Sequence, residues 1–191
     1  MKKLYLLLAG ALALIAVSCG PTVSLSKIGN PDPTLTGVWV NDSTVLENNG
    51  TGEAFDSYTF ASDGSFTQNG YMKMEMKDSA ATSVTYIDIS FSGAGTYGIA
   101  DGKINFKFKA SEGKATLDRF DMEFFDGTSE KDASTTKSII NLILVRPMMG
   151  MMKKSMKKDQ IYILDSLSED AFEMTNSSSK DATPSRYVRK R

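Results

Sequence analysis

Few residues in this sequence could carry out acid–base, nucleophilic or metal chemistry. Its 191 residues include no histidine and a single cysteine, Cys19. The lack of histidine excludes histidine-based catalytic triads, most zinc sites and a proximal histidine ligand for haem. Asp88, Asp118 and Asp121 are candidates for an acid/base pair, but the sequence does not place two of them together. We therefore expect a protein that is not an enzyme and uses neither a cofactor nor a metal.

One glycine-rich stretch, residues 93–98 (GAGTYG), has the spacing of a dinucleotide-binding fingerprint. That fingerprint requires a strand before it and a helix after it, so that the phosphate meets the N-terminus of the helix. The residues that follow instead lead to Asp101-Gly102, the strongest short hairpin signal in the chain. We interpret the glycines as the place where a barrel strand bends.

Charge gives no indication of a nucleic-acid partner. The chain has 22 Lys and Arg against 23 Asp and Glu, a formal net charge of −1. Binding to nucleic acid is expected to need a strongly basic surface. We expect no nucleic acid among its partners.

The N-terminus has the pattern of an export signal. Met1-Lys2-Lys3 is positively charged, and the apolar run Leu4–Val17 is too short to span a bilayer comfortably. Residues 16–20 (AVSCG) resemble a bacterial lipobox, which implies a signal peptide at 1–18 and a lipid on Cys19. The alternative is an ordinary secretory signal with an incidental thiol, although Cys19 has no disulfide partner. Residues 19–34 contain three prolines and predict a tether between lipid and domain.

The remaining residues, 35–191, read as one domain of antiparallel strands separated by turn signals. Met72, Met74 and Met76 alternate with polar or charged residues and Tyr71, which is typical of a strand with one apolar face. We expect strands at 35–41, 57–61, 65–77, 82–91, 96–100, 103–109, 114–125, 160–165, 170–175 and 185–191. The bulky inward candidates could line a cavity or fill it: Met72, Met74, Ile104, Phe106, Phe108, Phe120, Met122 and Phe124.

Residues 134–158 interrupt the strands and predict a helical insertion. Pro147 is compatible with the first turn of a helix. A helical period then gathers methionines on one face and lysines on the other (Met148, Met149, Met152 and Met156 against Lys153, Lys154, Lys157 and Lys158). We favour a helix packed on the barrel, with flexible methionines filling gaps. A lid or a helix on a membrane surface is the alternative.

Three segments carry a resemblance to a known family: Gly37-Val38-Trp39, residues 162–170 (YILDSLSED), and Arg186-Tyr187-Val188-Arg189. Together they resemble lipocalin-like (calycin) domain lipoproteins of the Bacteroidetes type, although the family's Thr-Asp-Tyr turn is absent. The resemblance implies an all-β, antiparallel, up-and-down barrel of about eight strands. It also implies that Gly37 bends the first strand and that Arg189 lies over Trp39 to close the barrel. Arg186 is the alternative partner of Trp39, because the register of the last strand is not fixed.

This architecture suggests two functions. The first is non-catalytic binding of a small apolar or amphipathic molecule by a protein anchored through its lipid to the outer membrane, on the periplasmic side. The second is a structural or interaction module with a filled barrel, which binds or inhibits another envelope protein. The space inside the barrel discriminates between them, since the fold alone does not fix the function.

Overall fold

A computed structural model describes residues 29–41, 44–45, 50–77, 83–124, 129–131, 138, 141–178 and 182–191. The predicted signal peptide and Cys19 lie outside the described residues, as does most of the tether. Within the described part, no helix is both long enough and apolar enough to cross a membrane.

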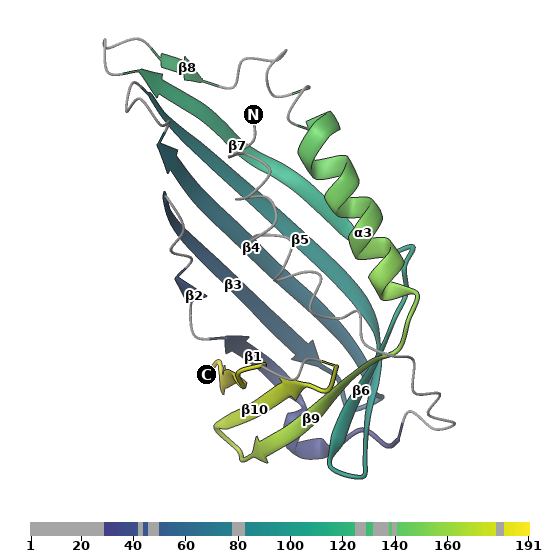
Figure 1. The fold of residues 1–191 in the computed structure, drawn as a ribbon. Helices are drawn as coiled ribbons and strands as arrows, with labels where there is room; N and C mark the ends of the chain where they lie inside the picture. The colour runs from purple at the N-terminus through teal and green to yellow at the C-terminus, as the bar shows by residue number, and fades with distance from the viewer. Residues whose placement is uncertain are drawn as a thin grey trace.

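The chain is built mainly from β-strands, with one α-helix late in the sequence (Figure 1). In order, the elements are η1 (Pro33–Leu35), β1 (Gly37–Asn41), β2 (Thr44–Val45), β3 (Gly50–Phe60), β4 (Ser65–Lys77), β5 (Ser83–Ala100), β6 (Lys103–Phe108), β7 (Lys114–Phe124), β8 (Ser129–Lys131), η2 (Asn141–Val145), α3 (Arg146–Met156), β9 (Gln160–Leu167), β10 (Ala171–Asn176) and β11 (Ser185–Arg189).

Eight strands close an antiparallel barrel. The ring runs β1-β3-β4-β5-β6-β9-β10-β11 and returns to β1 through the β1–β11 pair, in which Trp39 is opposite Arg189. Strands next to each other in the ring are joined in sequence order, so the barrel is of the up-and-down kind. The prediction of an all-β barrel with one helical insertion is therefore confirmed.

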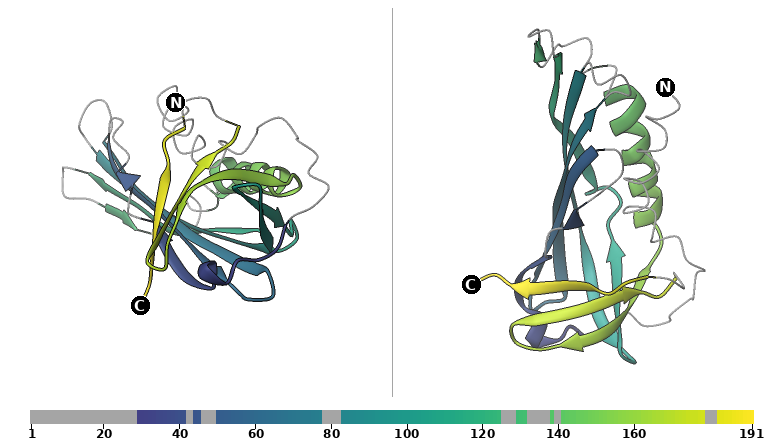
Figure 2. Two further views of the ribbon diagram at one scale, coloured as in Figure 1. Left: turned by 90° about the horizontal axis from the view of Figure 1, so that it is seen from below. Right: turned by 60° about the vertical axis from the view of Figure 1, so that its left-hand side comes forward.

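Three strands are longer than the barrel and continue beyond it as an open sheet (Figure 1). The C-terminal end of β5, Gly95–Ala100, pairs with β6 of the barrel, whereas its first part, Ser83–Ser92, pairs with β7. We call this open part the extension sheet: β2, β7, β8 and residues 50–56, 70–77 and 83–92 of the long strands. It stands above the closed barrel in Figure 1 and beside α3 in the right-hand view of Figure 2.

The extension sheet corrects two predictions. Residues 82–91 and 96–100, predicted as separate strands, belong to the single strand β5. The glycine-rich stretch lies inside that strand, where a Cβ on Gly95 would be 2.1 Å from the backbone oxygen of Lys107. Glycine is therefore required there by the close approach of β6, and no helix follows. The strand β7, expected to follow β6 around the ring, pairs with β5 and β8 instead.

The helical insertion packs against the strands. Pro147 lies in the first turn of α3, as predicted. Met152 and Met156 are buried, whereas Lys154 and Lys157 are exposed, so the methionine face points inward. Residues Ser134–Lys137 and the side chain of Met148 lie outside the described ones. This burial agrees better with a helix packed on the barrel than with a helix that lies on a membrane surface.

Two apolar clusters form the core. The first fills the barrel with aromatic side chains and includes Met152 and Met156 of α3. The second lies on the extension sheet and joins aliphatic side chains and Phe120 to Val145 of η2. Inward-facing residues of β4 and β5 contribute to both clusters, whereas Tyr58 and Phe60 of β3 belong to the first.

Candidate functional site

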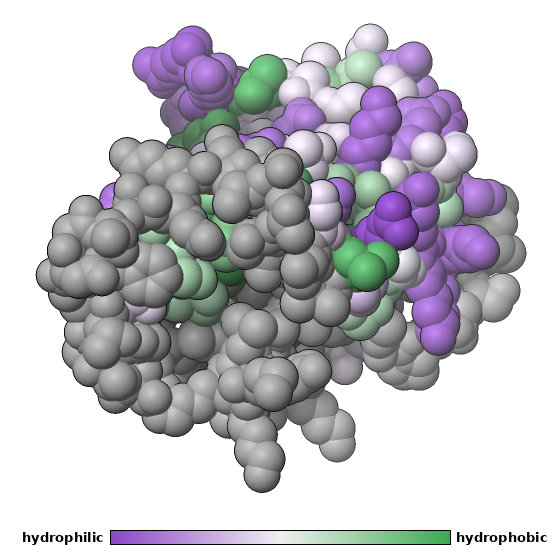
Figure 3. Space-filling view, turned by 90° about the horizontal axis from the view of Figure 1, so that it is seen from above, coloured by the Kyte–Doolittle hydropathy of each residue, from purple (hydrophilic) through white to green (hydrophobic). Residues whose placement is uncertain are grey.

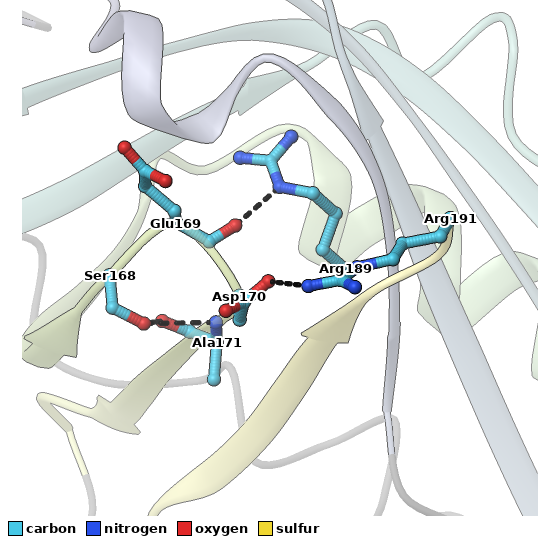
Figure 4. A network of polar contacts seen from close by, with 6 residues as sticks. All are labelled: Ser168, Glu169, Asp170, Ala171, Arg189 and Arg191. Atoms are coloured by element: carbon cyan, nitrogen blue, oxygen red, sulfur yellow. Dashed lines mark hydrogen bonds and ion pairs between the residues drawn. The ribbon is translucent and has the colours of Figure 1, made fainter.

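The closed end of the barrel is held by Trp39 and Arg189. The Arg189 guanidinium carbon lies 4.2 Å from the centroid of the Trp39 ring. Its Nη1 donates to the Thr36 carbonyl at 2.6 Å, and its Nε donates to the Glu169 carbonyl (Figure 4). The Trp39 indole N–H donates to the Leu35 carbonyl at 2.6 Å. Arg189 thus holds together the first strand, the residues before it and the turn between β9 and β10.

Arg186 is exposed and takes no part in this closure. Gly37, expected to bend the first strand, has a positive φ of 132°. A Cβ on Gly37 would lie 2.6 Å from Nη1 of Arg189. The position therefore needs glycine both for its backbone conformation and because the guanidinium lies against it.

Behind this closure, aromatic side chains fill the barrel. Ring centroids lie 4.6 Å apart for Phe60 and Tyr97, 4.8 Å for Phe66 and Phe108, and 4.8 Å for Phe172 and Tyr187. Trp39 meets Phe172 edge-on at 5.1 Å. All of these residues are buried. A bound molecule would have to displace these rings to enter this part of the barrel.

A polar cluster lies where the barrel meets the extension sheet. Asp56 of β3 accepts hydrogen bonds from Asn41 Nδ2 at 3.0 Å, Gln68 Nε2 at 3.2 Å and the Tyr187 hydroxyl at 3.0 Å. Gln68 Nε2 also donates to the Tyr58 hydroxyl at 3.0 Å. These five residues come from β1, β3, β4 and β11, and we call them the Asp56 cluster. They form a polar layer on top of the aromatic core.

Burial shifts the acid–base behaviour of this layer. Desolvation raises the pKa of the Asp56 carboxyl above its ordinary value, although hydrogen bonds from Asn41, Gln68 and Tyr187 oppose the shift. Desolvation also raises the pKa of Tyr58 and of Tyr187, and the negative charge of Asp56 is the next cause of both shifts. The same two causes raise the pKa of Tyr162 to about 12. The three phenols therefore stay protonated at neutral pH, and the Tyr187 hydroxyl donates to the carboxylate.

Beyond the Asp56 cluster, the inner face of the extension sheet is apolar. Met72 is buried there, whereas Met74, Met76 and Met122 are only partly buried. Seen from above, apolar surface is visible at this end of the molecule, coloured green in Figure 3. The inner face thus changes along the strands from aromatic to polar to methionine-rich.

The eight inward candidates divide between these two regions. Ile104, Phe106 and Phe108 belong to the filled barrel. Met72, Met74, Phe120 and Met122 belong to the extension sheet, and the side chain of Phe124 lies outside the described ones. They do not line one common cavity, because β7 is not a strand of the barrel.

Two of the three aspartates considered for acid/base chemistry, Asp88 and Asp121, lie beside Arg119. Asp121 forms an ion pair with Arg119, whose guanidinium carbon also lies 4.6 Å from the Tyr86 ring centroid. Asp88 is opposite Arg119 across the β5–β7 pair, and Asp118 is exposed. Among the described residues, no group of three or more His, Cys, Asp or Glu side chains is placed to hold a metal ion.

Sequence reasoning missed the Asp56 cluster, because its members are far apart in the chain. A signal was available in β3, where alternate positions hold Ala54, Asp56, Tyr58 and Phe60. An aspartate in the middle of an apolar alternation places a carboxylate on the inner face of a strand.

Comparison with known proteins gives no family. No protein-family model matches the chain, and no curated protein matches it. A crystal structure of an uncharacterized protein from Bacteroides eggerthii DSM 20697 is similar over 82% of this chain and 99% of that one, with 11% sequence identity and a TM-score of 0.36. A similarity of this size carries no argument about function.

Proposed function

We propose that this protein binds a small amphipathic molecule, without catalysis, on the inner face of the extension sheet. The observation that carries the proposal is the partly buried apolar surface of Met74, Met76 and Met122 next to the polar Asp56 cluster. Binding sites for small molecules are mostly apolar, with a few polar groups that fix orientation. Methionine side chains also adapt to ligands of different shape.

The proposal places the ligand outside the closed barrel, because aromatic rings fill that part. The closed barrel then serves as a rigid base for the long strands. On one side the site is limited by Val145 of η2, which is buried with the apolar cluster of the extension sheet.

We further propose that a lipid on Cys19 anchors the protein to the outer membrane, on its periplasmic side. The apolar run before Cys19 and the small residues around it support this assignment. We expect Cys19→Ala to release the protein into the soluble fraction or to leave its signal uncleaved. Fractionation of Cys19→Ala as a processed, tightly bound membrane protein would contradict the lipid anchor.

Ligand binding is tested by extracting purified mature protein with organic solvent and analysing the extract by mass spectrometry. We expect an apolar or amphipathic molecule in the wild-type extract and in that of Lys73→Glu. Met74→Glu should lose it, because the substitution puts a charge on the inner face. Lys73→Glu is the matched control, since Lys73 is the exposed neighbour of Met74 on the opposite face.

The filled barrel supports a second function, a structural or interaction module that binds or inhibits another envelope protein. Its interior is filled by the protein's own aromatic side chains. An empty extract, together with recovery of one envelope protein after cross-linking in cells, would favour this alternative over ligand binding.

A further inference from the structure

Within the described part of the chain, the Asp56 carboxylate has only neutral partners. Its two oxygens accept hydrogen bonds from the amides of Asn41 and Gln68 and from the Tyr187 hydroxyl. Among the residues that the structure describes, no lysine or arginine forms an ion pair with it. A desolvated carboxylate in such a place either takes up a proton or pairs with a cation.

The hydrogen bonds favour the ionised form. Asn41 Nδ2 donates to one oxygen of Asp56, and Gln68 Nε2 donates to the other. The Tyr187 hydroxyl lies within 3.3 Å of both. A protonated carboxyl would present fewer lone pairs to these donors, and Tyr187 would have to accept its proton instead of donating. An ionised carboxyl satisfies all three donors but leaves its charge without a counter-ion.

The carboxylate can be approached from the extension sheet. Asp56 is partly exposed, and its partner across the β3–β4 pair is Gly70. The Phe91 ring lies over Gly70, since a Cβ there would be 2.1 Å from its Cζ atom. The next inward residue of β3 toward the methionines is the small Ala54. A carboxylate beside an aromatic ring is a favourable environment for an organic cation.

We infer that the Asp56 cluster binds the cationic headgroup of an amphipathic amine whose hydrocarbon tail lies along Met74 and Met76. This inference rests on the proposed function and adds the charge of the ligand to it. The ammonium group supplies the counter-ion that the cluster lacks, and the tail covers the partly buried methionines.

Three ligands with the same tail test the inference: dodecylammonium, dodecanol and dodecanoate. Their affinities for the mature protein are measured at neutral pH by isothermal titration calorimetry, below the critical micelle concentrations of the two ionic ligands and below the solubility limit of dodecanol. We expect dodecylammonium to bind about tenfold or more tightly than dodecanol, because hydrogen bonds to charged groups are the strong ones. Dodecanoate should bind most weakly, since its carboxylate faces Asp56.

The variant Asp56→Asn should abolish the preference for the amine and leave dodecanol binding almost unchanged. Asp118→Asn, at an exposed aspartate of β7, is the matched control and should keep the preference. Should Asp56→Asn fail to fold, the ranking of the three ligands on wild-type protein still decides the question.

The outcomes separate the two proposals. Equal binding of all three ligands, or tightest binding of dodecanoate, would overturn the cationic headgroup but leave a site for amphipathic molecules. No binding of any of the three, together with an empty lipid extract, would overturn both.

Discussion

The closed barrel and the extension sheet share β3, β4 and β5 but are stabilised in different ways. The barrel part has no free strand edge, and stacked or edge-on aromatic pairs fill it. The extension sheet ends in the short strands β2 and β8, and its core consists of aliphatic side chains, methionines and Phe120. Aromatic pairs have specific geometries, whereas methionines fill irregular gaps. The same strands therefore provide a rigid base at one end and an adaptable surface at the other.

The largest expected effect is on the barrel. Trp39→Ala should lower the free energy of unfolding by about 3–5 kcal/mol, the usual cost of truncating a buried aromatic residue. Urea denaturation followed by far-ultraviolet circular dichroism measures it. A cost within about 0.5 kcal/mol, the level of typical surface substitutions, would mean that the barrel does not depend on its filled interior.

The next effect tests how the helix joins the two regions. Met152→Ala should cost about 2–3 kcal/mol, at the lower end of the range for a buried methionine, because the helix can partly close the gap. Met151→Ala is the matched control, because Met151 is 42% exposed on the same helix, and it should stay within about 0.5 kcal/mol of wild type. Equal costs for the two variants would show that α3 does not pack on the barrel in solution.

A smaller effect is expected at the barrel closure. Arg189→Ala should cost about 1–2 kcal/mol through loss of the cation–π contact and of packing by the arginine stem. Since Trp39 is the only tryptophan, its emission should shift or change in intensity in Arg189→Ala but not in Arg186→Ala. Combined with Trp39→Phe in a double-mutant cycle, Arg189→Ala should be non-additive. Additive costs and unchanged emission would show that the contact contributes nothing.

The smallest effect concerns the boundary between the regions. The pKa of Asp56 is raised in the folded protein, so the native state keeps a proton that the unfolded chain loses. Stability should therefore fall as pH rises from the unfolded value of the group through its folded value. Tyr58, Tyr162 and Tyr187, which face the carboxyl, stay protonated throughout this range because their pKa values are raised too.

Asp56→Asn removes this titration. As pH rises, Asp56→Asn should therefore become more stable relative to wild type, and this difference in unfolding free energy should then level off. Urea denaturation between about pH 4 and pH 8 measures it, and the other carboxylates cancel in the difference. A difference that does not vary with pH would contradict a raised pKa at Asp56.

Local patterns in the sequence predicted individual elements well. The alternation around Met72 and Met74 identified β4, and Asp101-Gly102 identified the hairpin between β5 and β6, where both residues have positive φ. The spacing of methionines also identified the inward face of α3. Each of these signals lies within a few residues of the chain.

Arrangements that depend on distant strands were not predictable in the same way. In the sequence, the glycines near position 95 suggest that one strand ends and another begins, yet β5 continues through them. Glycine is needed there because β6 approaches the backbone of β5 closely. The placement of β7 beside β5, and hence the extension sheet, follows from the length of β5 rather than from any local motif. The Asp56 cluster combines β1, β3, β4 and β11, whose adjacency exists only after the barrel has closed.

The contact between Arg189 and the residues before β1 also has a kinetic consequence. Arg189 and the Thr36 carbonyl are 153 positions apart in the chain, so this contact closes one of the longest loops available. The hairpins β3–β4 and β4–β5 join neighbouring segments and can form early, whereas pairing of β1 with β11 must wait for the rest. Interactions absent from the transition state act mainly on the unfolding rate. Weakening this closure should therefore speed unfolding and leave the folding rate nearly unchanged.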